Sequence, residues 1–196
     1  MNKTLKSTIK KVGFNWQTEI LAEYLLEEKI LNIEPKIKVV IKEAQSSDFD
    51  KLVDMAGEKK VDIFRKRFKS GAVCFIAIDR DKIAYYGWMG FANEYEANCQ
   101  IMVKLNNKEA YWFDCWTAPE YRKMGLHTAV TARALIYLRD KGYKKVLSFI
   151  TVKNIPSLKA FDRVGFRGKK VVTFIMLFGL KFHIWRKFNG DLMQRV

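Results

Sequence analysis

The stretch that decides the fold is WTAPEYRKMGLHTA, residues 116–129, in which a β-rich run gives way to a helical pattern. Pro119 ends the run, because proline supplies no strand donor and pre-sets the φ angle of a turn. The first N–H groups of the following helix lack partners within the helix, and the helix dipole makes this end partly positive. Gly125 allows close approach of a phosphate, and Arg122 and Lys123 add full charges. The turn therefore indicates an anion site, although by itself a simple helix cap explains it equally well.

Strands and helices alternate on the C-terminal side of this turn. The predicted elements are a helix over residues 126–140, a strand over 145–152, a helix over 156–164 and two strands within 171–185. Gly142 and Gly165 follow the two helices at the positions where helices commonly stop, and Gly179 divides the apolar tail. This alternation is typical of an α/β domain.

The N-terminal side of the turn predicts more strands than helices. The predicted elements are an amphipathic helix over residues 17–32, a strand over 37–42, helices over 48–56 and 59–68, and strands over 72–78, 83–91, 100–105 and 110–117, with a polar loop over 93–98. The first helix depends on apolar residues that recur near helical spacing, among them Ile20, Tyr24 and Leu25, and Pro35 ends it. We therefore expect a helical extension over residues 1–36 and one α/β (α+β) domain over 37–196, with a mixed central sheet flanked by helices.

Composition narrows the class of protein. The 196 residues contain no apolar run of the roughly 20 residues that a membrane-spanning helix needs, and the start, MNKTLK, lacks a secretory pattern. Three cysteines without paired spacing and two histidines argue against a metal site and favour reduced thiols. These features predict a cytoplasmic protein.

The charge is strongly basic, with 36 basic and 21 acidic residues and a formal net charge of +15. Such a surface attracts anions: nucleic acid, an acidic membrane surface or a phosphorylated ligand such as coenzyme A. A soluble protein from a lysine-rich proteome explains the same imbalance. The basic residues are scattered, and no RNA- or DNA-binding signature accompanies them, so we expect no nucleic-acid partner.

A second motif, NIPSLKAFDRVGF at residues 154–166, follows one strand after the turn. The pattern Arg122-x-x-Gly125, followed by Asn154, Ser157 and the Gly165-Phe166 pair, resembles the GNAT acyltransferases in content, order and separation. The resemblance covers residues 37–196. It implies a single GNAT-like domain, acetyl-CoA or another acyl-CoA as cosubstrate, and N-acyltransferase activity, in the simplest case N-acetyl transfer to an amine.

The resemblance also implies cofactor contacts. In the family, groups at the end of the strand before the turn pair with pantetheine, the amides of the turn hold the diphosphate, and the second motif lies along the pantetheine arm. The positions that match are Cys115, Trp116, Thr117, Arg122, Lys123, Met124, Gly125, Leu126, His127, Thr128, Asn154, Ser157 and Phe161. Two of them depart from the family pattern. His127 replaces a small residue and either donates to a phosphate or is simply a packed or exposed ring, and Phe161 stands where many members have a tyrosine that protonates the leaving thiolate.

The reaction needs a proton acceptor for the attacking amine. Asp114, on the strand before the turn, is the first candidate if a bulge turns it toward the acceptor, and Glu120 is an alternative. Glu94 and Glu96, in a loop, are further alternatives, although a solvated carboxylate explains each of them. Cys115 has no histidine nearby in the motif, so we expect direct attack rather than covalent catalysis.

The acceptor itself is not specified, although a small molecule or amino sugar is favoured over a protein amine. The aromatic and basic tail over residues 178–188 is compatible with membrane-surface contact or a homodimer. Two other classes stay open: a non-catalytic acyl-CoA-binding relative, which Phe161 favours, and a basic nucleic-acid-binding module.

Overall fold

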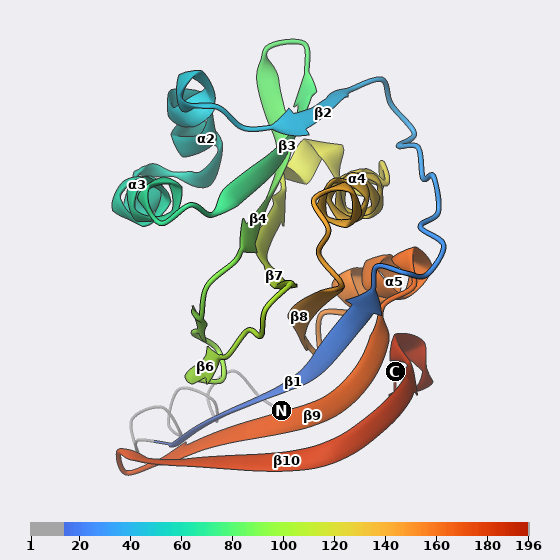
Figure 1. Cartoon of the computed structure of the whole chain (residues 1–196). Coiled ribbons are helices and arrows are strands. Elements are labelled where there is room, and N and C mark those ends of the chain that lie inside the picture. The colour runs from blue at the N-terminus through green and yellow to red at the C-terminus, as the bar shows by residue number, and fades with distance from the viewer. Residues whose placement is uncertain (1–13, 196) are drawn as a thin grey trace.

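A computed structural model describes residues 14–195, in which eight strands form one sheet with the order β10-β9-β1-β8-β7-β4-β3-β2 (Figure 1). The strands are β1 (Phe14–Leu25), β2 (Val40–Glu43), β3 (Val73–Asp79), β4 (Lys82–Gly90), β5 (Glu94–Glu96), β6 (Ile101–Val103), β7 (Glu109–Thr117), β8 (Lys145–Thr151), β9 (Arg167–Leu177) and β10 (Leu180–Asp191). The strands β5 and β6 pair separately. The helices are η1 (Ser46–Asp48), α2 (Phe49–Ala56), η2 (Glu58–Lys60), α3 (Val61–Lys69), η3 (Pro119–Tyr121), α4 (Leu126–Asp140), α5 (Ile155–Val164) and η4 (Leu192–Arg195).

The sheet is mixed, as the sequence predicts. Strands β7 and β8 are parallel, and the other neighbours in the large sheet are antiparallel. Because parallel strands cannot be joined by a tight turn, α4 makes the crossover between β7 and β8. The fold class, a mixed sheet flanked by helices, is confirmed.

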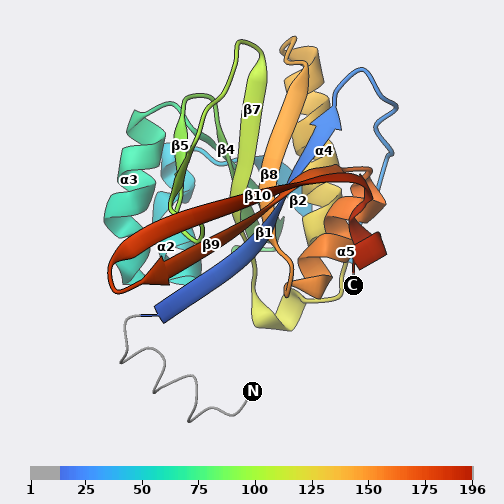
Figure 2. The ribbon, with the colours of Figure 1, turned by 90° about the horizontal axis from the view of Figure 1, so that it is seen from below.

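Helices cover both faces of the sheet (Figures 1 and 2). The larger core lies under α4 and α5 and includes the fully buried Trp112 and Leu135. A second core lies under α2 and α3 and includes Phe64, whose ring centre is 5.2 Å from that of Trp88. The sheet is therefore buried on two sides around β4 and β7, and β7 leads to the turn at Gly125.

The helix predicted over residues 17–32 is wrong, because β1 occupies most of this range. Ile20, Ala22 and Tyr24 are buried with the period of two that a strand shows. Strand β1 lies between β8 and β9 and pairs with both. These residues are thus part of the central sheet and not a helical extension, while residues 1–13 of the predicted extension lie outside the described residues.

The other predicted elements are confirmed within a few residues. The loop predicted over residues 93–98 contains the short strand β5, and the two strands predicted in the tail form the β9–β10 hairpin. None of the helices within residues 14–195 combines the length and the hydropathy that a membrane-spanning helix requires.

Candidate active site

Strands β7 and β8 separate soon after they meet, and this opening is the centre of the candidate site. Their parallel pairing covers only Glu109–Tyr111 against residues 145–147. The Ser148 hydroxyl donates to the Trp112 carbonyl at 2.9 Å, and no β8 residue is in register with the rest of β7. Backbone groups along the remainder of β7 can therefore pair with an extended ligand that enters between the two strands.

A β-bulge distorts β7 beside the opening. In the pairing with β4, Tyr86 lies opposite Trp116 but Trp88 lies opposite Phe113, so the register shifts. Asp114 has φ of 44°, a left-handed conformation that a non-glycine residue seldom adopts. The sequence analysis made Asp114 a candidate proton acceptor only if a bulge turns it, and this bulge is present.

The bulge turns the Asp114 carboxylate toward α3, where two cations hold it. Oδ2 of Asp114 accepts hydrogen bonds from the Lys60 ammonium, at 2.9 Å, and from the Arg67 guanidinium. Arg67 is itself packed, with its guanidinium carbon 4.8 Å from the ring centre of Phe113. Burial raises the pKa of Asp114, but Arg67 and Lys60 outweigh this effect and hold the pKa below its usual value. The geometry thus favours Asp114 as a structural anion rather than a proton acceptor.

Replacing Asp114 with asparagine should lower the free energy of unfolding by about 2 kcal/mol at neutral pH, because two partly buried cations lose their partner. The folded pKa of Asp114 is depressed, so its stabilising effect is present above the unfolded pKa of about 3.9 and is lost as pH falls through the folded pKa. Urea unfolding of both proteins across this range should show the difference narrowing below about pH 4. Equal stability at neutral pH would contradict the role of the pair.

The turn between β7 and α4 presents its main chain to one side. Lys123 and Gly125 both have positive φ, 65° and 77°, and Gly125 is the N-cap of α4 without a side-chain acceptor. The first intrahelical bond runs from Ala129 N to Gly125 O at 3.0 Å, so the amides of residues 126–128 point out of the helix end. The side chain of Arg122 lies over the exposed ring of Trp116, 5.3 Å from its centre. This combination of free amides and positive charge suits a diphosphate.

His127 is turned away from that side. Its Nδ1 lies 2.9 Å from the Tyr85 hydroxyl, and its ring centre is 5.0 Å from that of Phe161. Burial lowers the pKa of His127 to about 4, so the imidazole is neutral at physiological pH. The packed ring is what the structure shows, and only the backbone amide of His127 lies at the helix end. Nε2 is buried and has no partner among the described residues.

The second motif borders the same opening through α5. Asn154 is the N-cap of α5 and accepts a hydrogen bond from Ser157 N at 3.3 Å, so its amide nitrogen is the group that could still donate to a ligand. Phe161 is buried between His127 and Phe166, with a ring-centre distance of 4.9 Å to Phe166. No hydroxyl stands at position 161, and the nearby polar groups are those of Tyr85 and His127.

Two of the predicted carboxylates lie on the face of β7 opposite α4. Glu96 accepts a hydrogen bond from the Tyr111 hydroxyl, and Tyr111 is the last residue of β7 in register with β8. The side chain of Glu94 lies against Gly90, which is paired with Tyr111. Burial raises the pKa of Glu94, and the charge of Arg67 offsets only part of the effect. Both carboxylates therefore lie beside Tyr111, the position beyond which the opening begins.

Sequence reasoning missed Glu19, because β1 was expected to be a separate helix. Glu19 is buried and accepts hydrogen bonds from Asn98 and Thr151, at 3.0 and 2.9 Å. Burial and the nearby Glu96 raise the pKa of Glu19. No local pattern could have placed it here, since its neighbours come from β5–β6 and β8.

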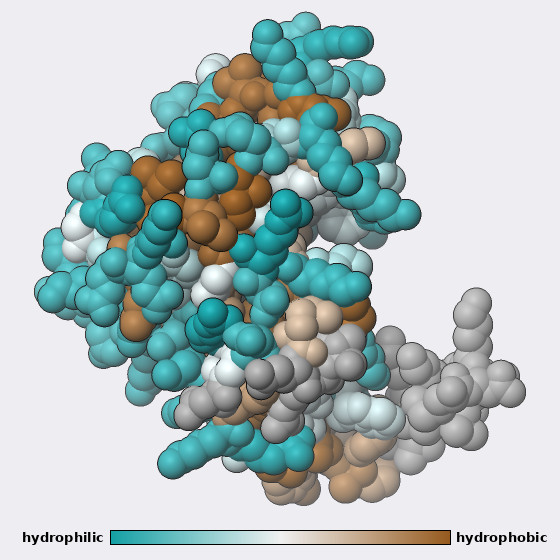
Figure 3. Space-filling view, turned by 90° about the vertical axis from the view of Figure 1, so that its right-hand side faces the viewer, coloured by the Kyte–Doolittle hydropathy of each residue, from teal (hydrophilic) through white to brown (hydrophobic). Residues whose placement is uncertain are grey.

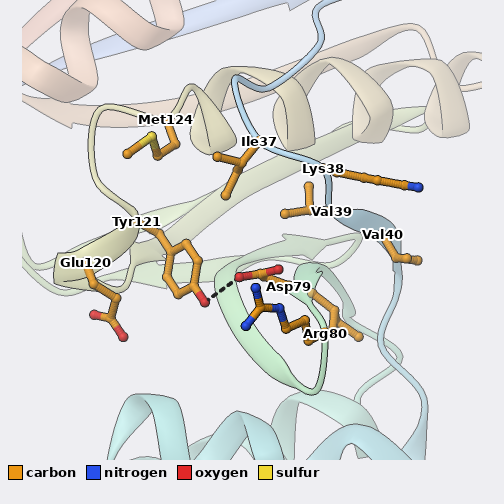
Figure 4. A pocket seen from close by; sticks show the side chains of 10 residues that line it. Ile37, Lys38, Val39, Val40, Asp79, Arg80, Glu120, Tyr121 and Met124 are labelled. Carbon is orange, nitrogen blue, oxygen red and sulfur yellow. Dashed lines mark hydrogen bonds between the residues drawn. The ribbon is translucent and has the colours of Figure 1, made fainter.

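A hollow of about 690 Å³ lies on the outer side of the turn (Figure 4). It is lined by Ile37, Lys38, Val39, Val40, Ile78, Asp79, Arg80, Glu120, Tyr121 and Met124. The Tyr121 hydroxyl donates to Asp79 at 2.9 Å across it. Glu120 is exposed on this hollow, whereas Glu94 and Glu96 lie on the face of β7 that carries Tyr111. The structure does not bring Glu120 together with those carboxylates.

Comparison with known proteins shows which family has this fold and these two motifs. The model of the Acetyltransferase (GNAT) family matches residues 40–166, which includes the bulged strand, the turn and the second motif. The chain belongs to the GNAT family. The family model matches well over half of the chain, and the resemblance seen in the two motifs is confirmed. Among curated proteins, no sequence relative matches.

Solved structures share this GNAT fold at low identity. A GNAT acetyltransferase from Colwellia psychrerythraea is 11% identical with a TM-score of 0.61, covering 89% of this chain and 62% of its own. A putative GNAT acetyltransferase from Novosphingobium aromaticivorans is 13% identical with a TM-score of 0.57, covering 84% of this chain and 66% of its own. A functionally unknown protein from Staphylococcus epidermidis is 11% identical with a TM-score of 0.56, covering 90% and 68%. The first two are longer proteins, of which this chain spans less than two thirds, and the likeness concerns the fold.

Proposed function

We propose that this GNAT protein transfers an acyl group, in the simplest case acetyl, from acyl-CoA to the amine of an acceptor. The proposal depends on one observation: the opening between β7 and β8 is continuous with the free amides at the start of α4. The opening between β7 and β8 begins beyond Tyr111, and β7 leads directly into the free amides at the start of α4. A long ligand with a diphosphate at one end and an amide-bearing arm at the other fits this junction.

The residues of the turn would hold the diphosphate through the amides of residues 126–128, with Arg122 and Lys123 adding charge. The arm would lie along Cys115–Thr117 on one side and near Asn154, Ser157 and Phe161 on the other. The Cys115 thiol is a poor nucleophile, since burial raises its pKa to about 12. Direct attack by the amine is therefore favoured.

In direct attack the amine nitrogen forms a bond to the thioester carbonyl carbon, and the carbon–sulfur bond then breaks. The amine loses a proton to a base, and the coenzyme A thiolate gains one. We assign the base to Glu94, acting through water, because its pKa is raised and its carboxylate forms no ion pair within the described residues. Asp114 is less suited, since two cations lower its pKa, and Glu96 is engaged by Tyr111.

A non-catalytic acyl-CoA-binding role is the second candidate function. Phe161 cannot supply a proton to the thiolate, and Asp114 is held by Lys60 and Arg67. Both features favour binding without turnover. The two roles differ in a single measurable property, because either protein would bind acyl-CoA but only the enzyme would release free thiol.

The purified chain should bind acetyl-CoA in calorimetry and release thiol when an amine from a panel of amino sugars, polyamines and amino acids is added. The panel should include a basic peptide, which tests the less favoured protein acceptor. Binding without thiol release for any amine or acyl chain length would favour the non-catalytic role. If acetyl-CoA, longer acyl-CoA and free coenzyme A all fail to bind, the proposal is wrong.

A further inference from the structure

Apolar side chains gather on the distal half of the β9–β10 hairpin and the adjoining start of β1. We call this surface the hairpin patch, and its members are Trp16, Leu177, Phe178, Leu180, Phe182 and Ile184. Each is between 38% and 72% exposed. Figure 3 shows apolar surface along the bottom of the molecule, where the hairpin lies. A concentration of exposed aromatic and aliphatic side chains of this size marks an interaction surface.

The strand register explains why the hairpin patch is exposed to solvent. Trp16, Ile175 and Phe182 lie opposite one another across β1, β9 and β10 and so share one face of the sheet. Further along β1 and β9, the pair Ile20 and Val171 lies on the same face. This pair is buried in the core under α4 and α5. Figure 1 shows β9 and β10 extending well past α5. One half of the face is thus covered by helices and the other half is not.

The turn at the tip holds an aromatic ring outward at a conformational cost. Leu177 and Leu180 pair, which leaves Phe178 and Gly179 as a two-residue turn with φ of 48° and 83°. Positive φ at both positions ordinarily selects Asn-Gly or Gly-Gly, because a larger side chain is strained there. Phe178 is nevertheless 72% exposed and contributes nothing to the core. Folding does not account for a phenylalanine at this position.

The charge around the patch is of one sign. No aspartate or glutamate occurs from Val171 to Asn189. Arg186 lies on the same face of β10 as Phe182 and Ile184, and Lys181 and Lys187 lie on the other face. The Lys153 ammonium lies 5.7 Å from the ring centre of Trp16. Aromatic rings bordered by lysine and arginine suit the boundary of an anionic bilayer, where the rings enter the headgroup region and the cations attract acidic lipids.

The same charges disfavour a second copy as the partner. Strand β10 is at the edge of the sheet, so the obvious dimer would pair two β10 strands antiparallel about a two-fold axis. Such pairing brings the cations of one β10 against those of the other, and like charges on opposed strands are destabilising. Lysine on an edge strand is also a common device against pairing between edges.

From these observations we propose that the hairpin patch docks the protein on anionic phospholipid membranes. The tip ring of Phe178 inserts, with Leu180, Phe182 and Ile184 behind it. Arg186, on the same face of β10, and Lys153, beside Trp16, contact the lipid phosphates. Phe178, Leu180, Phe182 and Ile184 are not among the residues proposed to contact acyl-CoA, whereas Trp16 contacts Lys153, the neighbour of Asn154. The active site would then act beside a membrane.

The test is co-sedimentation of the full chain with two kinds of vesicle. One kind is phosphatidylcholine alone, and the other contains roughly one-third phosphatidylglycerol, a fraction at which a few cationic side chains are measurably attracted to the membrane. We expect binding to the anionic vesicles that weakens as salt is raised, with a blue shift of tryptophan fluorescence. Phe178→Asn should reduce binding about tenfold, as expected for losing one buried phenylalanine, while thermal stability stays equal or rises because asparagine tolerates positive φ. Lys153→Glu combined with Arg186→Glu should abolish the preference for anionic vesicles, because these are the cations on the face of the patch.

Val40→Thr is the matched control, because Val40 is 61% exposed on β2, at the opposite edge of the sheet. It should leave vesicle binding unchanged. The proposal is overturned if the anionic vesicles do not bind the protein, or if Val40→Thr weakens binding as much as Phe178→Asn. It is also overturned if sedimentation without lipid shows a dimer that Phe178→Asn dissociates, since the patch would then be an interface between copies.

Discussion

Replacing Gly125 with leucine should weaken acetyl-CoA binding by about 100-fold or more, which corresponds to losing two amide hydrogen bonds to a charged group at about 1.5 kcal/mol each. Gly125 has φ of 77°, where a side chain is strained, and it is the N-cap of α4. A Cβ added there would meet no atom closer than the Pro35 Cα at 3.8 Å, so the leucine has room in the fold. The side chain would instead occupy the space in front of the free amides. Calorimetric titration with acetyl-CoA measures the effect.

Gly142 offers a matched control at the other end of the same helix. Its φ is 78°, and a Cβ added there would meet nothing within 4 Å. Leucine at either glycine should therefore cost a similar ~1–2 kcal/mol in stability, because each forces a side chain into the left-handed region. Gly142→Leu should nevertheless bind acetyl-CoA normally. Equal loss of affinity in the two variants would show that strain in α4, and not the anion site, explains the result.

Replacing Glu94 with glutamine should lower kcat about 100-fold once an acceptor is known, the lower end of what a general base contributes. Acetyl-CoA affinity should be unchanged, because Glu94 lies on the face of β7 opposite α4. A base acts as the carboxylate, so the wild-type rate should rise with pH through the Glu94 pKa. Burial raises that pKa, which places the rise above the usual range for glutamate. The variant should lack this rise.

The same pH profile in two other variants decides between the candidate bases. Glu120→Gln should behave as wild type, because Glu120 is exposed on the hollow outside the turn. Asp114→Asn should lose stability rather than the pH-dependent rise, because the Asp114 carboxylate is paired with Lys60 and Arg67. A loss of the rise in either variant, with the rise retained in Glu94→Gln, would move the base to that residue.

The turn and the second motif could be predicted from the sequence because their signals are local. Pro119 ends β7, Gly125 begins α4, and Gly165 ends α5, and each acts on the backbone of its own neighbourhood. The order of these elements along the chain then leaves few topologies, and the parallel pairing of β7 and β8 is the one observed. The resemblance to the GNAT acyltransferases depends on the same local signals.

The N-terminal strand could not be predicted in the same way. Ile20, Tyr24 and their neighbours fit a helical period about as well as an alternating one, so their partners decide between the two. Those partners are Ile150 on β8 and Val171 on β9, both more than a hundred residues away in sequence. Because the sequence did not predict this strand, it also did not predict that Glu19 is buried or that Trp16 is part of the hairpin patch.

By itself, the sequence determined the family, the fold class and the backbone of the turn at Gly125, since glycine, proline and the helix start act over a few residues. Only the tertiary structure decided what each side chain does at the site. It paired Asp114 with Arg67 and Lys60, turned His127 against Tyr85, and set Glu94 beside Gly90. Burial and neighbouring charges control these roles, and both come from residues that the chain brings together only when it folds.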